Sequence, residues 1–175
     1  LYADQELATP SHYIAEKVGA LGPCYSISTA CTSSAKALIS AKALITADLA
    51  DVVICGGVDS LCKLTINGFN ALASMSTGMC KPFCDDRDGI NIGEGAALFV
   101  MSKEAPLENG VMFLGGGESS DAHHISAPDP SGNGAKSAMK AALAVADLLP
   151  SDIDYINAHG TATIKNDEME ALAIN

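Results

Sequence analysis

The sequence predicts an α/β fold with parallel strand pairing. Continuous β-branched or apolar runs, which are typical of buried strands, alternate with helix-like segments. Helices that separate strands in this way usually form crossover connections, and crossovers join parallel strands. The chain has 175 residues, 48% of them hydrophobic, which is enough for one medium domain with a substantial core.

The first third of the chain contains a strand, a helix and a second strand. CYSIST, residues 24–29, is a short strand candidate. A helix is expected over Ala35–Ala50, because this stretch contains no Gly and no Pro, and Ser33 or Ser34 is the expected N-cap. DVVICGG, residues 51–57, has the β-branched run of a strand that is buried on both faces.

The rest of the chain continues the alternation after a loop rich in glycine and charge, MSTGMCKPFCDDRDGINIGEG. The expected elements are, in chain order, a short helix over Thr65–Ser74, buried strands over Gly95–Ser102 and Val111–Gly117, a helix over Gly134–Leu149 that Pro150 ends, and a short strand over Asp154–Asn157. In the last of these helices, Lys136, Lys140 and Asp147 fall on one face, and Ala135, Met139, Ala142 and Ala146 on another.

Composition argues against several classes of protein. The formal net charge is −11 and the pI is near 4.5, which disfavours general nucleic-acid binding but leaves room for a local basic patch. No run of about 18 apolar residues is present, so a membrane span is not expected. The start, LYADQELATPSHYIAEKVG, lacks the basic and apolar regions of a secretory signal, and we expect a cytoplasmic protein.

The six cysteines do not indicate a disulfide scaffold. A long, apolar chain with this cysteine content is typical of a reducing compartment. Structural zinc sites prefer paired C-x₂-C spacings. Cys80 and Cys84 have three residues between them and no matching second pair, so no metal site is expected.

Cys31 is the first candidate for chemistry. It lies in STACTSS, among small hydroxyl residues and directly before the expected helix. The unpaired amides and positive dipole end of a helix favour a thiolate, which is the nucleophilic form. Two interpretations remain open on local sequence alone: an activated nucleophile, or a small residue in a tight turn between strand and helix.

His159 is the second candidate. It lies in NAHGTAT, a Gly- and Thr-rich loop at the end of the last expected strand, which is where α/β folds place their sites. A lone histidine is also a common structural residue. A cysteine with a histidine is nevertheless the minimal pair for covalent thiol catalysis.

Two further loops invite binding hypotheses. DAHHISAPDP carries Asp121, His124 and Ser126, but adjacent histidines on an extended segment point to opposite sides, so His123 and His124 are not expected to bind one metal ion. RDGINIGEG lacks the pattern of a phosphate-binding loop. Its Arg87 and its neighbouring acidic residues are expected to fold the loop on itself.

Taken in order, five segments resemble the β-ketoacyl-[acyl-carrier-protein] synthases of the thiolase-fold superfamily. They are STACTSS, ICGGVDS, CKPFCDDRDGINIGEGAALFVMSKE, SSDAHHISAPDPSGNGAKSAMKAAL and DIDYINAHGTATIKNDEMEA. KLTINGF and RDGINIGEGAALF are similar to synthases of the aryl-polyene type. The resemblance implies the layered αβαβα thiolase architecture. Residues 1–102 would be the end of its first half and residues 103–175 the start of its second, with a junction near 102–112.

The resemblance also implies residue roles and partners. Cys31 would accept an acyl chain from acyl carrier protein, and His159 would stabilise the enolate that forms when a malonyl thioester loses carbon dioxide. Thr161 and Thr163 would hold the pantetheine arm. Asp121, His124 and Ser126 would form a loop near the active site, with Ser126 where a threonine is more usual. The reaction needs no cofactor, Lys81 would meet the acidic carrier protein, and a homodimer is expected.

The chain also departs from the family pattern. Ile90 stands where the family commonly has Phe, and the second active-site histidine and the glycine-rich loop of the family have no counterpart here. We therefore expect a central fragment of a synthase that is inactive by itself. Two alternatives stay open: a thiolase-fold acyltransferase that does not condense, and a non-catalytic partner subunit that sets chain length.

Overall fold

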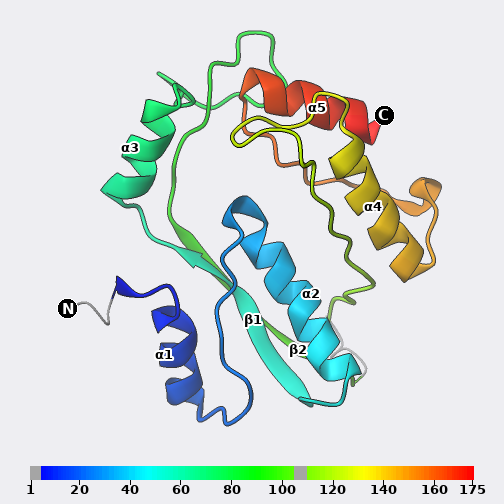
Figure 1. Cartoon of the computed structure of the whole chain (residues 1–175). Coiled ribbons are helices and arrows are strands. Elements are labelled where there is room, and N and C mark those ends of the chain that lie inside the picture. The colour runs from blue at the N-terminus through cyan, green and yellow to red at the C-terminus, as the bar shows by residue number, and fades with distance from the viewer. Residues whose placement is uncertain (1–4, 105–109) are drawn as a thin grey trace. The chain divides into compact units, whose positions relative to one another are not determined.

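The computed structural model describes residues 5–104 and 110–175. Its elements are α1 (Thr9–Val18), η2 (Ala30–Thr32, a 3₁₀ turn), α2 (Ser33–Thr46), β1 (Val52–Asp59), α3 (Lys63–Ala71), β2 (Gly95–Ser102), α4 (Asn133–Ala146), η3 (Pro150–Asp152) and α5 (Ile164–Ile174) (Figure 1). The chain divides into two compact units. Unit 1 comprises the chain up to Asp59 together with Glu94–Phe113, and unit 2 comprises Ser60–Gly93 together with Leu114–Asn175.

Unit 1 contains a two-stranded antiparallel sheet. β1 pairs with β2 along its whole length, from Val52 opposite Ser102 to Asp59 opposite Gly95. The predicted parallel pairing is therefore wrong for these two strands. The chain between them belongs to unit 2 and returns to β1 from the opposite direction, so no crossover helix joins the pair.

Helix α2 covers one face of this sheet (Figure 1). The most buried apolar residues of the unit lie at this contact: Ala41 and Ile45 of α2, and Cys55 of β1. Burial raises the pKa of the Cys55 thiol, which keeps it protonated and unreactive. Cys55 is therefore a packing residue.

The prediction that these strands are buried on both faces is wrong. Large apolar side chains of the sheet are exposed: Val52, Ile54, Val58, Leu98 and Val100. Within unit 1, α2 covers one face of the sheet. A run of β-branched residues does not show which faces of a strand are covered by other elements.

Three other predicted strands are not present in the described chain. Residues 24–29, 111–117 and 154–157 run without strand pairing. A strand is defined by a hydrogen-bonded neighbour, which local sequence cannot supply. Val111 and Tyr155 in these segments are 95% and 80% exposed. Within the predicted junction at 102–112, residues 105–109 lie outside the described residues.

The three predicted helices are confirmed as α2, α3 and α4, with ends shifted by a few residues. The predicted N-cap is wrong. Ser33 and Ser34 lie inside the first turn of α2, because η2 precedes the helix, and Thr32 takes the N-cap position without a side-chain bond to the helix. Helices α1 and α5 were not predicted.

Helices α4 and α5 pack together in unit 2 (Figure 1). The predicted faces of α4 are confirmed, since Lys136 and Lys140 are exposed while Ala135, Met139, Ala142 and Ala146 are half-buried. Among the helices that the structure describes, none has both the length and the apolar character needed to cross a membrane.

Candidate functional site

Cys31 lies at a sharp turn through which an extended segment enters α2. It is the middle residue of η2, and its side chain is exposed. The preceding residue, Ala30, has a φ of 55°, in the left-handed region that residues with a Cβ rarely adopt. Strain of this kind is typical of turns that present one side chain for a function.

The first turn of α2 lies directly on the sheet. A Cβ atom added to Gly57 of β1 would collide with the side chain of Ser34. A glycine at this position therefore allows the helix that follows Cys31 to sit against the strand backbone.

The loop that carries His159 is fastened to α5. Glu170 accepts the backbone N–H of His159 at 2.6 Å through Oε1 and that of Gly160 at 2.8 Å through Oε2. The imidazole of His159 is exposed. The hydroxyls of Thr161 and Thr163, both half-buried, lie 2.8 Å apart. The loop thus presents an imidazole and a pair of hydroxyl groups from a backbone that a helix holds.

A second carboxylate of α5 lies beneath this loop. Asp167 is 2% exposed. Its Oδ1 accepts the N–H of Ala162 at 3.1 Å, and its Oδ2 accepts the N–H of Phe83 at 2.7 Å. Ala162 and Phe83 have φ values of 60° and 61°, so this one carboxylate holds two residues in the left-handed region.

Arg87 joins the same cluster. Its Nη1 donates to the carbonyl of Cys84 at 2.9 Å, which folds the loop on itself as predicted. Its Nη2 also lies 3.5 Å from Glu168, and its Nε is 3.8 Å from Asp167 Oδ2. That Nε is buried and has no hydrogen-bond partner. The loop is therefore fastened to α5 as well as to itself.

Residues 80–83 pack against the His159 loop. The Cys80 thiol lies 3.7 Å from the carbonyl oxygen of Thr161. A Cβ on Gly160 would meet Pro82 at 3.3 Å and the Phe83 ring at 3.4 Å, and Gly160 itself has a φ of 53°. Glycine is therefore required there both by its backbone conformation and by its close neighbours.

Asp167 and Glu170 were not predicted as residues of the site. One signal could have found them: IKNDEMEALAI contains neither Gly nor Pro and follows a Thr-rich loop, so it reads as a helix start. On such a helix, acidic residues three positions apart share one face.

Asp121, His124 and Ser126 share one exposed loop of unit 2. Asp121 accepts the N–H of Asp129 at 3.0 Å, which closes the loop. Nδ1 of His124 accepts the N–H of Ser126 at 3.1 Å, so the proton of the neutral ring is assigned to Nε2. His124 and Ser126 are thus in contact, whereas Asp121 bonds to the far end of the loop.

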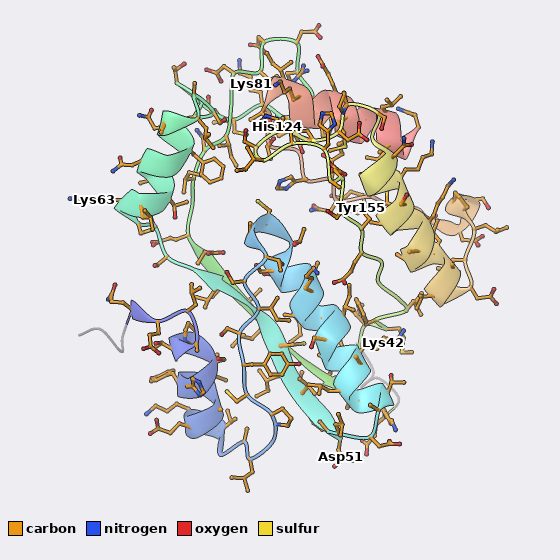
Figure 2. All side chains as sticks on the ribbon, in the orientation of Figure 1. Lys42, Asp51, Lys63, Lys81, His124 and Tyr155 are labelled. Carbon is orange, nitrogen blue, oxygen red and sulfur yellow. The ribbon has the colours of Figure 1, made fainter. Side chains whose placement is uncertain are left out.

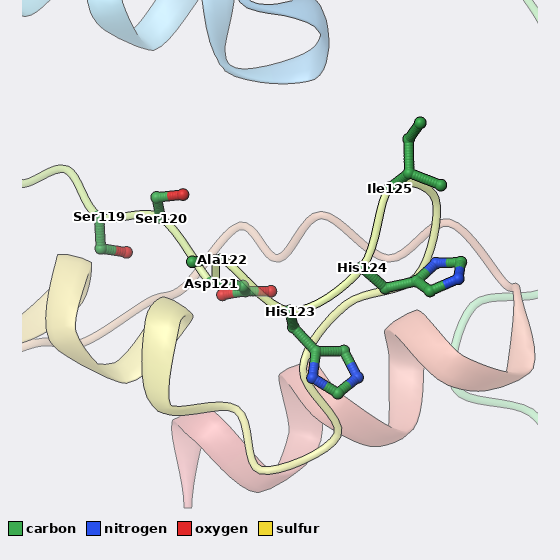
Figure 3. A pocket seen from close by; sticks show the side chains of 7 residues that line it. All are labelled: Ser119, Ser120, Asp121, Ala122, His123, His124 and Ile125. Atoms are coloured by element: carbon green, nitrogen blue, oxygen red, sulfur yellow. The ribbon is translucent and has the colours of Figure 1, made fainter.

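This loop lines an open hollow that runs from Ser119 to Ile125 (Figure 3). The rings of His123 and His124 project in different directions, as predicted for adjacent residues on an extended segment (Figure 3). Among residues 5–104 and 110–175, no group of three or more His, Cys, Asp or Glu side chains could hold a metal ion.

Lys81 is exposed (Figure 2) but has an anionic neighbour. Its Nζ lies 2.5 Å from Asp86, and this contact raises the pKa of Lys81 and lowers that of Asp86. A partner that binds Lys81 therefore competes with Asp86 for the ammonium group.

Asp88 organises the same loop. Its carboxylate accepts hydrogen bonds from the Ser76 hydroxyl at 2.6 Å, the Thr77 N–H at 3.0 Å and the Thr77 hydroxyl at 2.9 Å. Because all three bonds favour the charged form, they lower the pKa of Asp88 to about 2.

Cys31 belongs to unit 1, whereas His159, Thr161, Thr163, Asp121, His124 and Ser126 belong to unit 2. The structure therefore gives the local geometry of each group, and the pairing of the thiol with the imidazole is a proposal. Unit 1 thus carries an exposed cysteine on a strained turn, and unit 2 carries a histidine loop that is anchored to a helix.

The match to known family models identifies the chain. The model described as "Beta-ketoacyl synthase, N-terminal domain" matches residues 6–106, and "Beta-ketoacyl synthase, C-terminal domain" matches residues 112–175. The chain belongs to the β-ketoacyl synthase family.

Similar proteins support this assignment. Nodulation protein E of Rhizobium meliloti is 38% identical over 167 residues, which are 92% of this chain and 41% of that protein. The 3-oxoacyl-[acyl-carrier-protein] synthase 2 of Staphylococcus aureus is 37% identical over 168 residues, which are 90% of this chain and 42% of that protein. The chain therefore spans about two fifths of these relatives.

Solved structures show the same fold. The ketosynthase ApeO of Xenorhabdus doucetiae, solved in complex with its chain length factor ApeC, superposes with a TM-score of 0.95 at 48% identity. The match covers 99% of this chain and 43% of that one. A type II polyketide ketosynthase solved with its acyl-carrier protein, AntDE:AntF, gives a TM-score of 0.88 at 29% identity over 98% of this chain and 45% of that one. The chain thus has a partial ketosynthase fold of the thiolase-like type.

Proposed function

We propose that the protein containing these residues is a β-ketoacyl-[acyl-carrier-protein] synthase that uses Cys31 as its nucleophile. The observation that carries this proposal is the exposed thiol on a strained turn at the start of α2, in a chain that matches both synthase domains. Fatty acid or polyketide synthesis is the pathway class that fits the relatives.

The proposed reaction has two stages. The Cys31 thiolate attacks the carbonyl of an acyl thioester, the carrier thiolate leaves, and the acyl chain remains on Cys31. A malonyl thioester then loses carbon dioxide, and the electron pair of the broken bond becomes an enolate. The enolate carbon attacks the acyl carbonyl on Cys31, which releases a β-ketoacyl thioester and regenerates the thiolate.

His159 is assigned to the second stage. An N–H of its imidazole would donate to the enolate oxygen, where charge develops as carbon dioxide leaves. Its anchored backbone supports this role, because a donor that is already in place loses no binding energy to ordering. For the whole protein we propose the layered αβαβα architecture of two halves, divided near residues 102–112.

Thr161 and Thr163 are assigned to the pantetheine arm of the substrate. Their hydroxyls, 2.8 Å apart, form a pair of donors and acceptors suited to an amide group. Asp121, His124 and Ser126 are assigned to a loop at the substrate entrance. Lys81 is assigned to binding of the acidic carrier protein. On binding, its ammonium group would leave Asp86 and pair with an acidic group of the carrier protein.

The assembly is proposed to be a cytoplasmic homodimer. A heterodimer with a chain length factor is the second candidate, because ApeO was solved with such a partner and is 48% identical to this chain. Native mass spectrometry of the purified protein, with and without proteins encoded beside it, separates the two assemblies.

We further propose that residues 1–175 alone do not catalyse the condensation. The second active-site histidine and the glycine-rich loop of the family have no counterpart among these residues.

The central test is acylation of the whole protein. It is incubated with an acyl-carrier thioester, the adduct is mapped by mass spectrometry, and carbon dioxide release from malonyl carrier protein is measured. We expect the acyl group on Cys31, and loss of labelling in Cys31→Ala. Cys62→Ala and Cys84→Ala are matched controls, because both thiols are also exposed. A label on Cys62 or Cys84 contradicts the assignment.

The same assay decides between the alternatives. Acylation of Cys31 without carbon dioxide release favours an acyltransferase that does not condense. The absence of both favours a non-catalytic chain-length subunit, although the presence of Cys31 argues against that. Comparing aryl-primed polyene thioesters with saturated acyl thioesters tests the aryl-polyene subfamily.

A further inference from the structure

The hydroxyl of Ser33 spans the turn that holds Cys31. Its Oγ accepts the backbone N–H of Thr29 at 2.8 Å and donates to the backbone carbonyl of Ala30 at 2.7 Å. One side chain thus bonds to the two residues that precede the cysteine, from a position two residues after it. The hydroxyl of Thr32 adds a bond to the carbonyl of Thr29 at 2.9 Å.

We propose that Ser33 is a positioning residue that sets the direction of the Cys31 thiol. This inference rests on the proposed function, in which Cys31 is the nucleophile. Ser33 itself does not touch the reacting atoms. It acts through the backbone of Thr29 and Ala30, which carries Cys31.

The strain at Ala30 is the physical reason. Its φ of 55° is unfavourable for a residue with a Cβ and persists only where surrounding bonds enforce it. The Ser33 bonds are such a restraint, because they close a ring around Ala30. Without the hydroxyl, Ala30 is free to relax toward negative φ, and Cys31 moves with it.

Ser34 and Ser40 do not share this role. The Ser34 side chain lies against Gly57 of the sheet. Ser40, two turns further along α2, pairs with the Tyr25 hydroxyl at 2.5 Å. Ser40 therefore gives a matched control: a hydrogen-bonded serine on the same helix that does not contact the turn.

A displaced thiol lowers the rate of acylation more than it lowers substrate binding. A misplacement of about 1 Å at a reacting atom costs up to about a hundredfold in rate. For Ser33→Ala we expect the rate constant for acylation of Cys31 to fall by about tenfold to a hundredfold. The KM for the acyl carrier substrate is expected to change by less than about twofold, because Ser33 makes no contact with substrate.

The test uses the whole protein and compares Ser33→Ala, Ser33→Thr and Ser40→Ala by single-turnover acylation, with thermal melting of each variant. Ser33→Thr keeps the hydroxyl and is expected to retain the wild-type rate, as is Ser40→Ala. Adding Ala30→Gly to Ser33→Ala is expected to restore part of the rate, since glycine adopts positive φ without strain.

Three outcomes overturn the proposal: an unchanged rate in Ser33→Ala, an equal loss in Ser33→Thr, or no recovery with Ala30→Gly. Failure of the proposed function gives a different result, because the wild-type protein would then not be acylated on Cys31 at all. A wild-type protein that is acylated on Cys31, with Ser33→Ala equally fast, removes only the role of Ser33.

Discussion

Both oxygens of the Glu170 carboxylate are used by the loop of His159: Oε1 accepts the N–H of His159 at 2.6 Å and Oε2 that of Gly160 at 2.8 Å. Hydrogen bonds between backbone amides and a charged carboxylate are stronger than those between neutral groups. The backbone that carries the candidate enolate-stabilising imidazole is therefore bonded to a helix.

The first prediction concerns Glu170→Gln. A neutral amide of the same shape accepts with one oxygen only and places an NH₂ group against the other backbone N–H, which loosens the loop. We expect carbon dioxide release from malonyl carrier protein to fall by about tenfold to a hundredfold while Cys31 is acylated at the normal rate. The two half-reactions are measured separately on the whole protein.

Glu168→Gln is the control for that experiment. Glu168 lies on the same helix and is exposed, and its contact is with Arg87 at 3.5 Å. Decarboxylation should be unchanged in this variant. Equal effects of the two substitutions would show that the negative charge of α5, rather than the bonds to the loop, is what matters.

The second prediction concerns Asp167→Ala. This substitution leaves the N–H groups of Phe83 and Ala162 without an acceptor and removes the buried one of the two carboxylates beside Arg87. Breaking a buried charge pair typically costs about 3–5 kcal/mol. We expect the free energy of unfolding, measured by urea denaturation, to fall by about 3 kcal/mol. A loss below about 0.5 kcal/mol, the range of ordinary surface changes, would contradict this.

The third prediction concerns the charge of Asp88. Its pKa of about 2 lies below the ordinary value of 3.8, so its contribution to stability is present above pH 4 and is lost as the pH falls through 2. Carboxyl NMR should report a midpoint near 2. Ser76→Ala removes the bond with the largest effect, so the midpoint should rise toward 3.8 in that variant. An unchanged midpoint would exclude the hydrogen bond from Ser76 as the main cause of the low pKa of Asp88.

The fourth prediction compares two glycines of unit 2. A Cβ on Gly117 would collide with the carbonyl of Ala138 and lie 2.6 Å from the backbone N of Ala142, both in α4. Backbone atoms cannot move aside as a flexible side chain does, so Gly117→Ala should destabilise the protein by about 1–3 kcal/mol.

Gly68 is the matched position, because a Cβ there meets nothing within 4 Å and the residue lies inside α3. Gly68→Ala should be neutral or should stabilise by about 0.5–1 kcal/mol. Thermal melting of both variants measures the difference. Equal destabilisation by the two substitutions would contradict close approach to α4 as the reason for glycine at position 117.

Local chemistry in the sequence was sufficient for several features. α2 was predicted because its stretch lacks Gly and Pro, α4 because it carries an amphipathic pattern, and β2 was predicted with its bounds, Gly95–Ser102. These features depend on residues close together in the chain, where propensity and capping act.

The missed features depend on distant residues. The antiparallel register of Val52 with Ser102 joins positions fifty residues apart, so local pattern did not reveal it. Residues 24–29 have strand-like sequence without strand pairing, because propensity does not provide a neighbouring strand. Asp167 has no apolar run around it that would indicate burial, yet it is the most buried charged residue of unit 2.

The order of its motifs, on its own, determined the family of this protein and named Cys31 and His159 as the residues to test. Tertiary structure alone decided what holds them: Ser33 around the turn of the cysteine, and Glu170 with Asp167 beneath the loop of the histidine. The reason is that chemical identity is local to a residue, whereas a strained backbone persists only through bonds that folding brings together.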